Sequence, residues 1–261
     1  MNLSLYQKNA LVGGASAGIG RAVAIELAAL GANVTLVART ESTLRQAVGA
    51  LDTSQGQQHG YLIADFDDSQ ILLVKVGELL RRHPIHILVN NTGGPPGGPI
   101  TEALPEEFLR AYHNHLICNQ LLAQAVLPGM KAAGFGRIIN IISTSVKEPL
   151  ENLGVSNTTR WAVASWAKTW ANESGRLGVT VNNVLPGFTQ TDRLKEIIEK
   201  RAAATNRAVA DMENQLRNQV PLQRFADPAE VAAAVAFLAS PAAAYINGVN
   251  LPVDGGRTRS L

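Results

Sequence analysis

Residues 11–21 read LVGGASAGIGR, a short apolar run that meets a glycine-rich turn. After this turn, Val23, Leu27 and Leu30 recur at steps of three and four residues, which is the spacing of a helix. A strand that enters a helix through glycines can turn sharply and bring its backbone close to an anion, because the first N–H groups of a helix have no partner within it. The stretch therefore predicts a cradle for the pyrophosphate of a dinucleotide.

The same turn permits two other interpretations. It could be a plain tight connection, and Gly14, Ser16 and Gly18 also have the spacing of a hydrolase nucleophile elbow. An elbow needs earlier strands for its oxyanion loop and usually a late histidine, whereas little precedes this turn and the last histidine is His115. The sequence favours the dinucleotide cradle.

Composition narrows the class of protein. The chain has 261 residues, of which 46% are hydrophobic and 17% charged, and this suits one large α/β domain with a sizeable core. A net charge of +2 without basic runs argues against nucleic acid as a partner. The N-terminus lacks the pattern of a signal peptide and no stretch has the length of a membrane span, so we expect a soluble, cytoplasmic protein without membrane contact. The histidines lack ligand spacing, and no metal site is expected.

Strand-like and helix-like segments alternate along the chain. The expected strands cover residues 10–12, 34–38, 61–64, 86–89, 137–142, 179–185 and 249–253, and the main helices start at 21 and cover 69–82, 105–132, 152–175 and 229–239. Such alternation implies right-handed crossovers and a parallel sheet that is buried on both faces. The prediction is an α/β fold: a single doubly wound parallel sheet of about seven strands, with helices on both faces.

Residues 189–220 break this alternation, because they are charged and polar and contain no strand-like run. An insertion after the sixth strand would lie above the carboxyl edge of the sheet, where ligands bind in such folds. We expect a substrate lid here within one domain that spans residues 1–261, although an inert surface excursion is the alternative.

Four motifs together resemble the short-chain dehydrogenase/reductase family, in particular its β-ketoacyl-acyl-carrier-protein reductase-like branch, and the resemblance spans essentially the whole chain. Gly14, Gly18 and Gly20 match the family's glycine turn, with Gly13 where threonine is usual. Residues 90–93 (NNTG), 182–187 (NNVLPG) and 253–256 (VDGG) match its later signatures in the right order. The resemblance implies a Rossmann-like fold, an NAD(P) cofactor and a homodimer or homotetramer.

The cofactor type follows from charge at the end of the second strand. An acidic residue there accepts from the 2′-hydroxyl of NAD, whereas an arginine accommodates the 2′-phosphate of NADP, and this chain has Arg39 without a carboxylate. The alternative is that Arg39 simply solvates the strand end. We expect NADP, and the resemblance adds adenine contacts by Asp65 and Phe66. The expected cofactor-binding residues are Gly14, Ser16, Ala17, Gly18, Ile19, Gly20, Arg39, Asp65, Phe66, Asn91, Thr92, Gly93, Arg160, Pro186, Gly187 and Thr189.

The catalytic pattern of the family is incomplete in this chain. Its members carry Asn, Ser, Tyr and Lys; here Ser143 matches the serine, but Ser156 and Arg160 occupy the positions of Tyr and Lys. No tyrosine lies between Tyr112 and Tyr245 that a shift in register could supply. The position of the family's Asn is held by His115.

The missing tyrosine removes the usual proton donor for the alkoxide that ketone reduction forms. Arg160 is permanently charged, so it can bind ribose hydroxyls and stabilise an oxyanion but cannot exchange a proton. His115 is the nearby group that ordinarily titrates near neutral pH, which makes it the candidate acid. The hypothesis is that Ser143, Ser156 and Arg160 polarise the carbonyl while His115 or water supplies the proton; the alternative for His115 is a buried helix contact.

Two function classes remain open at this stage. The first is an NADP-dependent oxidoreductase that acts on a carbonyl, alcohol or acyl-thioester substrate with an altered acid. The second is a sensor or interaction subunit that kept the fold and binds NADP without hydride chemistry. On the helix that carries Arg160, Trp161, Trp166 and Trp170 could form a substrate-stacking wall, but packing is the favoured interpretation; Cys118 is expected to be a small buried residue rather than a nucleophile.

Overall fold

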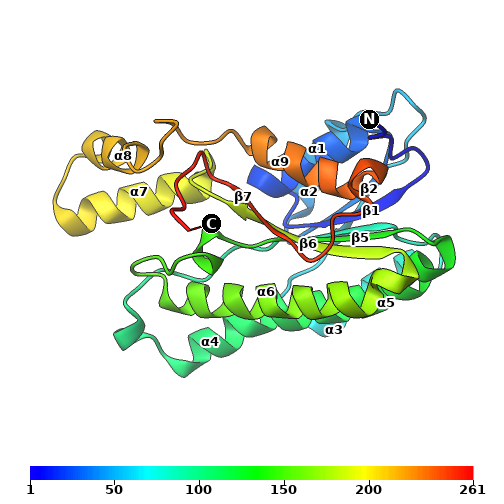
Figure 1. Cartoon of the computed structure of the whole chain (residues 1–261), viewed down its shortest axis with the longest axis horizontal. Coiled ribbons are helices and arrows are strands. Elements are labelled where there is room, and N and C mark those ends of the chain that lie inside the picture. Colours follow the sequence, from blue (N-terminus) through cyan, green and yellow to red (C-terminus); the bar gives the residue numbers. More distant parts are fainter. Residues whose placement is uncertain (261) are drawn as a thin grey trace.

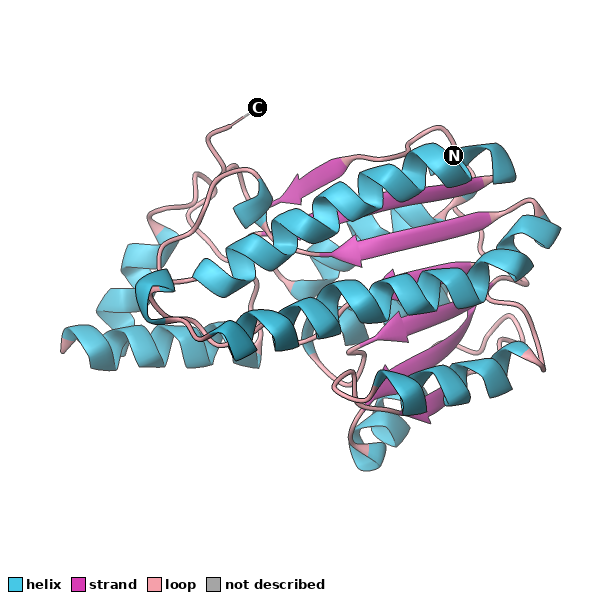
Figure 2. Ribbon diagram, turned by 90° about the horizontal axis from the view of Figure 1, so that it is seen from below, coloured by secondary structure: helices cyan, strands magenta, loops and turns pink. Residues whose placement is uncertain are grey.

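The computed structural model describes residues 1–260, which form a seven-stranded sheet with the order β3-β2-β1-β4-β5-β6-β7. Every neighbouring pair of strands is parallel, and Figure 2 shows all arrowheads pointing to one side of the molecule. The strands are β1 (Asn9–Gly13), β2 (Asn33–Ala38), β3 (Gly60–Ile63), β4 (Ile87–Asn90), β5 (Gly136–Ile141), β6 (Val179–Pro186) and β7 (Asn250–Val253). The predicted doubly wound parallel sheet is confirmed.

Helices cover both faces of this sheet (Figure 1). One face carries α1 (Gly18–Ala29), α2 (Glu41–Gly49) and α9 (Pro228–Ala239), and the other carries α3 (Ser69–Leu80), α4 (Pro105–Tyr112), α5 (Cys118–Ala133) and α6 (Gly154–Ser174). The remaining two, α7 (Asp192–Thr205) and α8 (Val209–Arg217), project beyond the carboxyl ends of the strands. None of the helices within residues 1–260 is long and apolar enough to span a membrane.

The strands are apolar on both sides because each face of the sheet has its own core. Val12 and Ile139 pack in the cluster under α1 and α9, whereas Leu11 and Ile138, one residue away in each strand, pack in the cluster under α3 and α5. Side chains of a strand point alternately to the two faces, so a sheet buried on both faces requires unbroken apolar runs. This is why the strands could be recognised without an alternating polar pattern.

A ladder of asparagine side chains crosses the carboxyl half of the sheet. Asn90 donates to Asn140 (2.8 Å), Asn140 donates to Asn183 (2.8 Å), and Asn183 donates to Asn250 (2.7 Å), so that β4, β5, β6 and β7 are joined in sequence. Because buried amides are stable only when hydrogen-bonded, the ladder fixes the register of these four strands. Only the folded chain brings these distant residues together.

The segment expected as one helix over residues 105–132 contains a π-helical turn. Residues His113–Ile117 form this turn, and the helix continues through it from α4 into α5. A π turn fits an extra residue into the helix, and such turns are frequent at functional sites. The π turn sets the direction of the His115 side chain. A regular helix of 3.6 residues per turn would place that side chain differently.

Candidate functional site

A large cavity lies at the carboxyl edge of the sheet, beside the neighbouring strands β1 and β4, where the strand order reverses. In doubly wound sheets ligands bind at this switch point, because the loops on either side lead away in opposite directions. The cavity has a volume of about 740 Å³. Its lining includes Gly14, Ser16, Arg39, Asp65, Phe66, Thr92, Gly93 and His115 from the predicted site, together with Ala38, Thr40, Ala64, Asp67, Gly94, Pro95, Pro96, Glu107, Arg110, Ala111 and Asn114.

The glycine turn connects β1 to α1 in a backbone conformation that requires glycine. Gly14 and Gly18 have φ angles of 55° and 54°, in the left-handed region that side chains rarely adopt. A Cβ on Gly20 would lie 2.3 Å from the carbonyl oxygen of Gly14, so the start of α1 packs directly on the turn. The cap residue Ala17 offers no side-chain hydrogen bond to the first turn of the helix, which begins at Gly18. The N–H groups of that turn are therefore available to an anion.

Asn91, which directly follows β4, fixes the position of this turn. Its Nδ2 donates to the carbonyl oxygens of Gly13 (3.1 Å) and Gly14 (3.3 Å). A Cβ on Gly14 would lie 2.8 Å from both the Asn91 side-chain nitrogen and its backbone oxygen. The predicted residues Asn91 and Gly14 thus belong to one rigid unit, whose parts come from two neighbouring strands.

Arg39, Asp65 and Phe66 lie at the ends of β2 and β3 and line the same cavity. The guanidinium of Arg39 is exposed, and within residues 1–260 no hydrogen bond or ion pair engages it. The Asp65 carboxylate accepts from the backbone N–H of Asp67 (3.1 Å), which holds the loop after β3. The site thus offers a cation and a carboxylate at separate strand ends.

A polar network between this loop and α4 escaped the sequence analysis. The Asp67 carboxylate pairs with Arg110 and accepts from Nδ2 of Asn114 (2.6 Å), and these two contacts lower the pKa of Asp67. Arg110 and Asn114 are four residues apart on one helical stretch, a spacing that puts both side chains on one face. That spacing was the available signal, but the partner loop could only be identified in the folded chain.

His115 is buried, with 3% of its surface exposed, and its Nδ1 lies 2.6 Å from Oγ1 of Thr92. Burial, assisted by the nearby charge of Arg160 and opposed by a hydrogen bond with the Gly93 backbone, lowers the pKa of His115 to about 2. The imidazole is therefore neutral at physiological pH. The expectation that His115 titrates near neutral pH is wrong, because a cation at this depth would be desolvated beside another cation.

Arg160 lies beneath the loop that follows β4. Its Nη1 donates to the carbonyl oxygen of Ile141 (3.2 Å), its Nε is buried without a hydrogen-bond partner, and a Cβ on Gly94 would lie 3.7 Å from its Nη2. Burial lowers the pKa of Arg160 to about 10, so the guanidinium remains charged at neutral pH. A buried cation with an open donor is suited to hold hydroxyl or oxyanion oxygens.

The two serines occupy the ends of neighbouring elements. Ser143 follows β5, and its hydroxyl accepts from the N–H of Ser145 (3.0 Å) at the start of a short 3-10 turn, Thr144–Val146. Ser156 is half-buried in the first turn of α6, one turn before Arg160. Within residues 1–260, neither hydroxyl hydrogen-bonds to Arg160 or His115, so the structure places these groups in one region without a closed catalytic triad.

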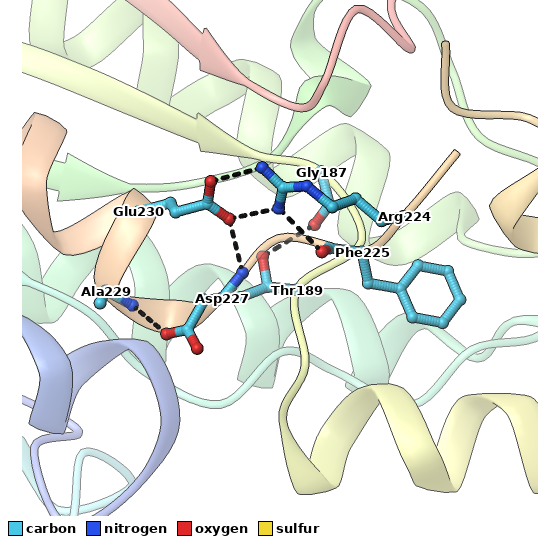
Figure 3. Close-up of polar contacts among 7 residues, drawn as sticks. All are labelled: Gly187, Thr189, Arg224, Phe225, Asp227, Ala229 and Glu230. Atoms are coloured by element: carbon cyan, nitrogen blue, oxygen red, sulfur yellow. Dashed lines mark hydrogen bonds and ion pairs between the residues drawn. The ribbon is translucent and has the colours of Figure 1, made fainter. Parts of the chain in front are cut away.

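The chain that leaves β6 is anchored at both ends of the 189–220 insertion (Figure 3). Thr189 donates to the carbonyl oxygen of Gly187 (3.2 Å) at the exit of β6. At the return, Arg224 pairs with both carboxylate oxygens of Glu230 (2.6 Å each), and the Asp227 carboxylate caps α9 through the N–H of Ala229 (2.8 Å). The hydrogen bond with Arg224 is the main cause that lowers the pKa of Glu230 to about 2.

Between these anchors the insertion forms α7 and α8 around a small core of its own, composed of Leu194, Ile198, Ala202, Met212, Leu216 and Phe225. Its first turn reaches the cofactor-sized cavity: the Thr191 side chain lies 3.2 Å from the position of a Cβ on Gly18, and Arg193 donates to the carbonyl oxygen of Pro95 (3.0 Å). The start of α7 therefore lies beside the glycine turn and the loop after β4 that contains Pro95.

The prediction that the tryptophans of α6 pack in the interior is confirmed for two of the three, and the prediction for Cys118 is confirmed. The indole nitrogens of Trp166 and Trp170 both donate to Oε1 of Gln120 (2.7 and 2.8 Å), so these rings pack between α6 and α5. Trp161 is exposed instead, and its indole nitrogen donates to the carbonyl oxygen of Ser145 (2.8 Å). Cys118 is buried and its thiol donates to the carbonyl oxygen of Phe66 (3.2 Å). Burial raises the pKa of Cys118 to about 11, which leaves the thiol protonated and unreactive.

The residues present fit a dinucleotide. The cavity has the size of a cofactor site, and the glycine turn leaves backbone N–H groups free at a helix start. Arg39 lines the cavity, and Arg160, whose buried Nε has no acceptor, lies next to Gly94 in the cavity wall.

Comparisons with known proteins agree with this geometry. A family model described as enoyl-(acyl carrier protein) reductase matches residues 14–258. The 3-oxoacyl-acyl-carrier-protein reductase of Vibrio cholerae is 36% identical over 256 residues, covering 97% of this chain and 98% of that protein, and the one of Pseudomonas aeruginosa is 34% identical over 259 residues with the same coverage.

Solved structures show the same architecture. The L-sorbose reductase of Gluconobacter frateurii, determined with NADPH and L-sorbose, superposes with a TM-score of 0.93 at 30% identity over the full length of both chains. A variant of actinorhodin polyketide ketoreductase, determined with NADPH, gives a TM-score of 0.90 at 30% identity over 97% of each chain.

Proposed function

Since the chain belongs to the short-chain dehydrogenase/reductase family and is similar to 3-oxoacyl-acyl-carrier-protein reductases, we propose that it is an NADPH-dependent reductase of carbonyl compounds that works without a tyrosine acid. The observation that carries the proposal is the buried, charged Arg160 beside the cofactor-sized cavity, with its Nε left without an acceptor. The substrate class is a small ketone or a 3-oxoacyl thioester, the class named for the relatives.

NADPH supplies the hydride in this reaction. The glycine turn from Gly14 to Gly20 would hold its pyrophosphate, and Arg39 would pair with the 2′-phosphate through the planar fork of its guanidinium. Asp65 and Phe66 would contact the adenine, while Asn91, Thr92 and Gly93 would form the wall next to the nicotinamide. Pro186, Gly187 and Thr189 would cover the nicotinamide from the side of β6.

Arg160 stabilises the negative charge that develops on the substrate oxygen, with Ser143 and Ser156 as further hydroxyl donors. The guanidinium keeps its own proton, and His115 is neutral because of its low pKa. The proton that completes the alcohol therefore comes from water. His115 is a positioning residue that holds Thr92 through the 2.6 Å contact between Nδ1 and Oγ1.

The direct test follows NADPH oxidation with a panel of ketones, ketoses and 3-oxoacyl thioesters, with a 3-oxoacyl-acyl-carrier-protein reductase as the positive control. Turnover with at least one class is the expected result. Tight NADPH binding without oxidation of the whole panel would contradict the proposal and favour the second class of function, a cofactor-binding sensor or interaction subunit.

The role of water as proton source has its own test. In the double variant Ser156→Tyr, Arg160→Lys the family's acid is restored, and kcat for a ketone should rise by about tenfold or more, within the range that a general acid contributes. The matched control, Ser156→Phe with Arg160→Lys, adds the same ring without the hydroxyl and should not accelerate the reaction. Equal rates of the two double variants would show that proton delivery at this position is not limiting.

We also propose that residues 189–220 act as the substrate lid of a single NADP-binding domain. The contact of Arg193 with Pro95 and the position of Thr191 beside Gly18 support a lid that closes on the bound cofactor. The separate small core of α7 and α8 lets the pair move as one body.

A homodimer, or a tetramer built from it, is the proposed assembly. Large apolar side chains are exposed on one helical layer: Ile100, Leu104, Leu109, Tyr112, Ile117 and Trp161. They belong to α4, its flanking turns and α6, which lie together in Figure 1. Several exposed apolar side chains on neighbouring helices are typical of a protein interface, and a second copy of the chain would cover them around a twofold axis.

A further inference from the structure

A second cavity opens at the opposite edge of the sheet, where the strands begin. It lies between the N-terminal ends of β5 and β6 and the segment that links α9 to β7, and its volume is about 590 Å³. The side chains that matter here are those of Phe135, Arg137, Thr180 and Tyr245. The cofactor-sized cavity lies at the other ends of the strands, so the two cavities are separate.

Arg137 is a buried cation in the wall of this cavity, with 4% of its surface exposed. Its Nη1 donates to the backbone oxygen of Gly136 (2.8 Å), whereas its Nε is buried without a hydrogen-bond partner. Within residues 1–260, no carboxylate pairs with this guanidinium, and burial lowers its pKa. An unpaired buried charge is costly to keep in a folded protein, so an anionic partner would stabilise it.

Thr180 supplies a second donor beside Arg137. The two residues are direct partners in the register of β5 and β6, so their side chains point to the same face of the sheet. The Thr180 hydroxyl is buried and has no hydrogen-bond partner. Two neighbouring strands thus present adjacent donors that lack acceptors.

One aromatic ring lies against Arg137, and a second lines the cavity. The Arg137 guanidinium carbon lies 4.1 Å from the centre of the Phe135 ring, and the Lys8 ammonium lies 4.6 Å from the same centre. Tyr245 is fully exposed at the cavity. The surroundings combine positive charge with apolar surface.

We propose that this cavity is a binding site for a small organic carboxylate, separate from the cofactor site and independent of the proposed reaction. The Nε–Nη2 edge of Arg137, whose Nε has no hydrogen-bond partner, would receive the two carboxylate oxygens in the bidentate arrangement that guanidinium favours, and the Thr180 hydroxyl would donate to one of them. The apolar part of the molecule would pack against Phe135 and Tyr245. The cavity volume is in the range of small-molecule sites.

Calorimetric titration of the full chain with benzoate tests this site, with benzamide as the uncharged match and inorganic phosphate as the other anion. Benzoate binding with at least about tenfold preference over benzamide is expected, because charge-assisted hydrogen bonds contribute most of the affinity. Absence of benzoate binding at millimolar concentration overturns the proposal, and so does binding of phosphate in preference to benzoate.

Variants locate the site. Arg137→Gln should weaken benzoate binding by about tenfold or more. Thr180→Val should weaken it severalfold without harm to the fold, because it only removes a hydroxyl that has no partner. Arg39→Gln, which removes the free cation of the cofactor cavity, should leave benzoate binding unchanged. If Arg137→Gln does not fold, the benzoate affinity of Thr180→Val decides whether the site is correct. Loss of benzoate binding in Arg39→Gln, together with full binding in Thr180→Val, would assign benzoate to the cofactor cavity and overturn the proposal.

Discussion

The charge states of Arg160 and His115 depend on their surroundings in the folded protein, which the sequence does not specify. Each has an ordinary role in water, as a flexible cation and as a neutral-pH acid. Burial removes both groups from water: the arginine still keeps its charge at neutral pH, whereas the histidine loses its own, chiefly through desolvation and further through the nearby charge of Arg160. The pair therefore offers one fixed positive charge and one neutral hydrogen-bonding ring.

The low pKa of His115 makes the fold sensitive to acid. Its folded pKa of about 2 lies below the ordinary 6.5, so the unfolded chain binds the proton first and stability falls as the pH drops below 6.5. We expect a loss of up to about 1.4 kcal/mol per pH unit between pH 6.5 and 4.5. In this window Glu230, whose pKa falls from 4.5 to about 2, still contributes fully.

Urea titrations of the wild type and of His115→Asn at several pH values measure this effect. The free energy of unfolding of the variant should vary less between pH 6.5 and 4.5. Part of the slope will remain, because burial also lowers the pKa of His86. Identical slopes for the two proteins would contradict a neutral, buried His115.

Arg39 should determine the choice between the two nicotinamide cofactors. Replacing it by Gln removes the charge-assisted hydrogen bonds to the 2′-phosphate, and we expect the Kd for NADPH to rise by roughly 10- to 100-fold. The Kd for NADH, which lacks this phosphate, should stay within about twofold of the wild-type value. Fluorescence titration with both cofactors separates the outcomes, and a parallel loss of NADH affinity would assign Arg39 a structural role instead.

At the scale of elements, the glycine turn and the π turn illustrate different degrees of predictability. The turn between β1 and α1 is encoded locally, because Gly14, Gly18 and Gly20 are each required by φ or by close backbone contact. The π turn around His115 carries no comparable local signal. It is stabilised where α4 and α5 pack against α6 and the loop after β4, so sequence periodicity predicts one plain helix there.

Gly20→Ala tests the tight packing of α1 on the turn. The added methyl would lie 2.3 Å from the Gly14 carbonyl and 2.7 Å from Nδ2 of Asn91, and backbone atoms cannot move aside cheaply. We expect about 1–3 kcal/mol of destabilisation and a loss of NADPH binding. Gly77→Ala in α3 is the matched control: no atom lies within 4 Å of its Cβ position, and the substitution should be neutral or slightly stabilising. Equal stability of the two variants in thermal melts would contradict this packing.

At the scale of the whole molecule, the exposed apolar layer on α4 and α6 predicts self-association. Leu109 is 70% exposed, and Leu109→Glu should shift the protein towards monomer in sedimentation velocity by placing a charge in the interface. Val74→Glu, at an exposed position of α3 that is not among the six apolar residues of the proposed interface, should leave the assembly unchanged. A monomeric wild type at micromolar concentration would remove the basis for the proposed dimer.

Much of this protein could be read from its sequence, because the deciding signals are short-range. The apolar runs of the strands, the glycine turn and Arg39 at a strand end predict the parallel sheet and the place of a dinucleotide, since strand ends of one sheet meet at one edge. What needed the tertiary structure involves residues far apart in the chain: the asparagine ladder from Asn90 to Asn250, the network of Asp67 with Arg110, and the charge states of His115 and Arg160. Hydrogen bonding across strands and the cost of burying charge depend on neighbours in space, and no local pattern in the sequence specifies them.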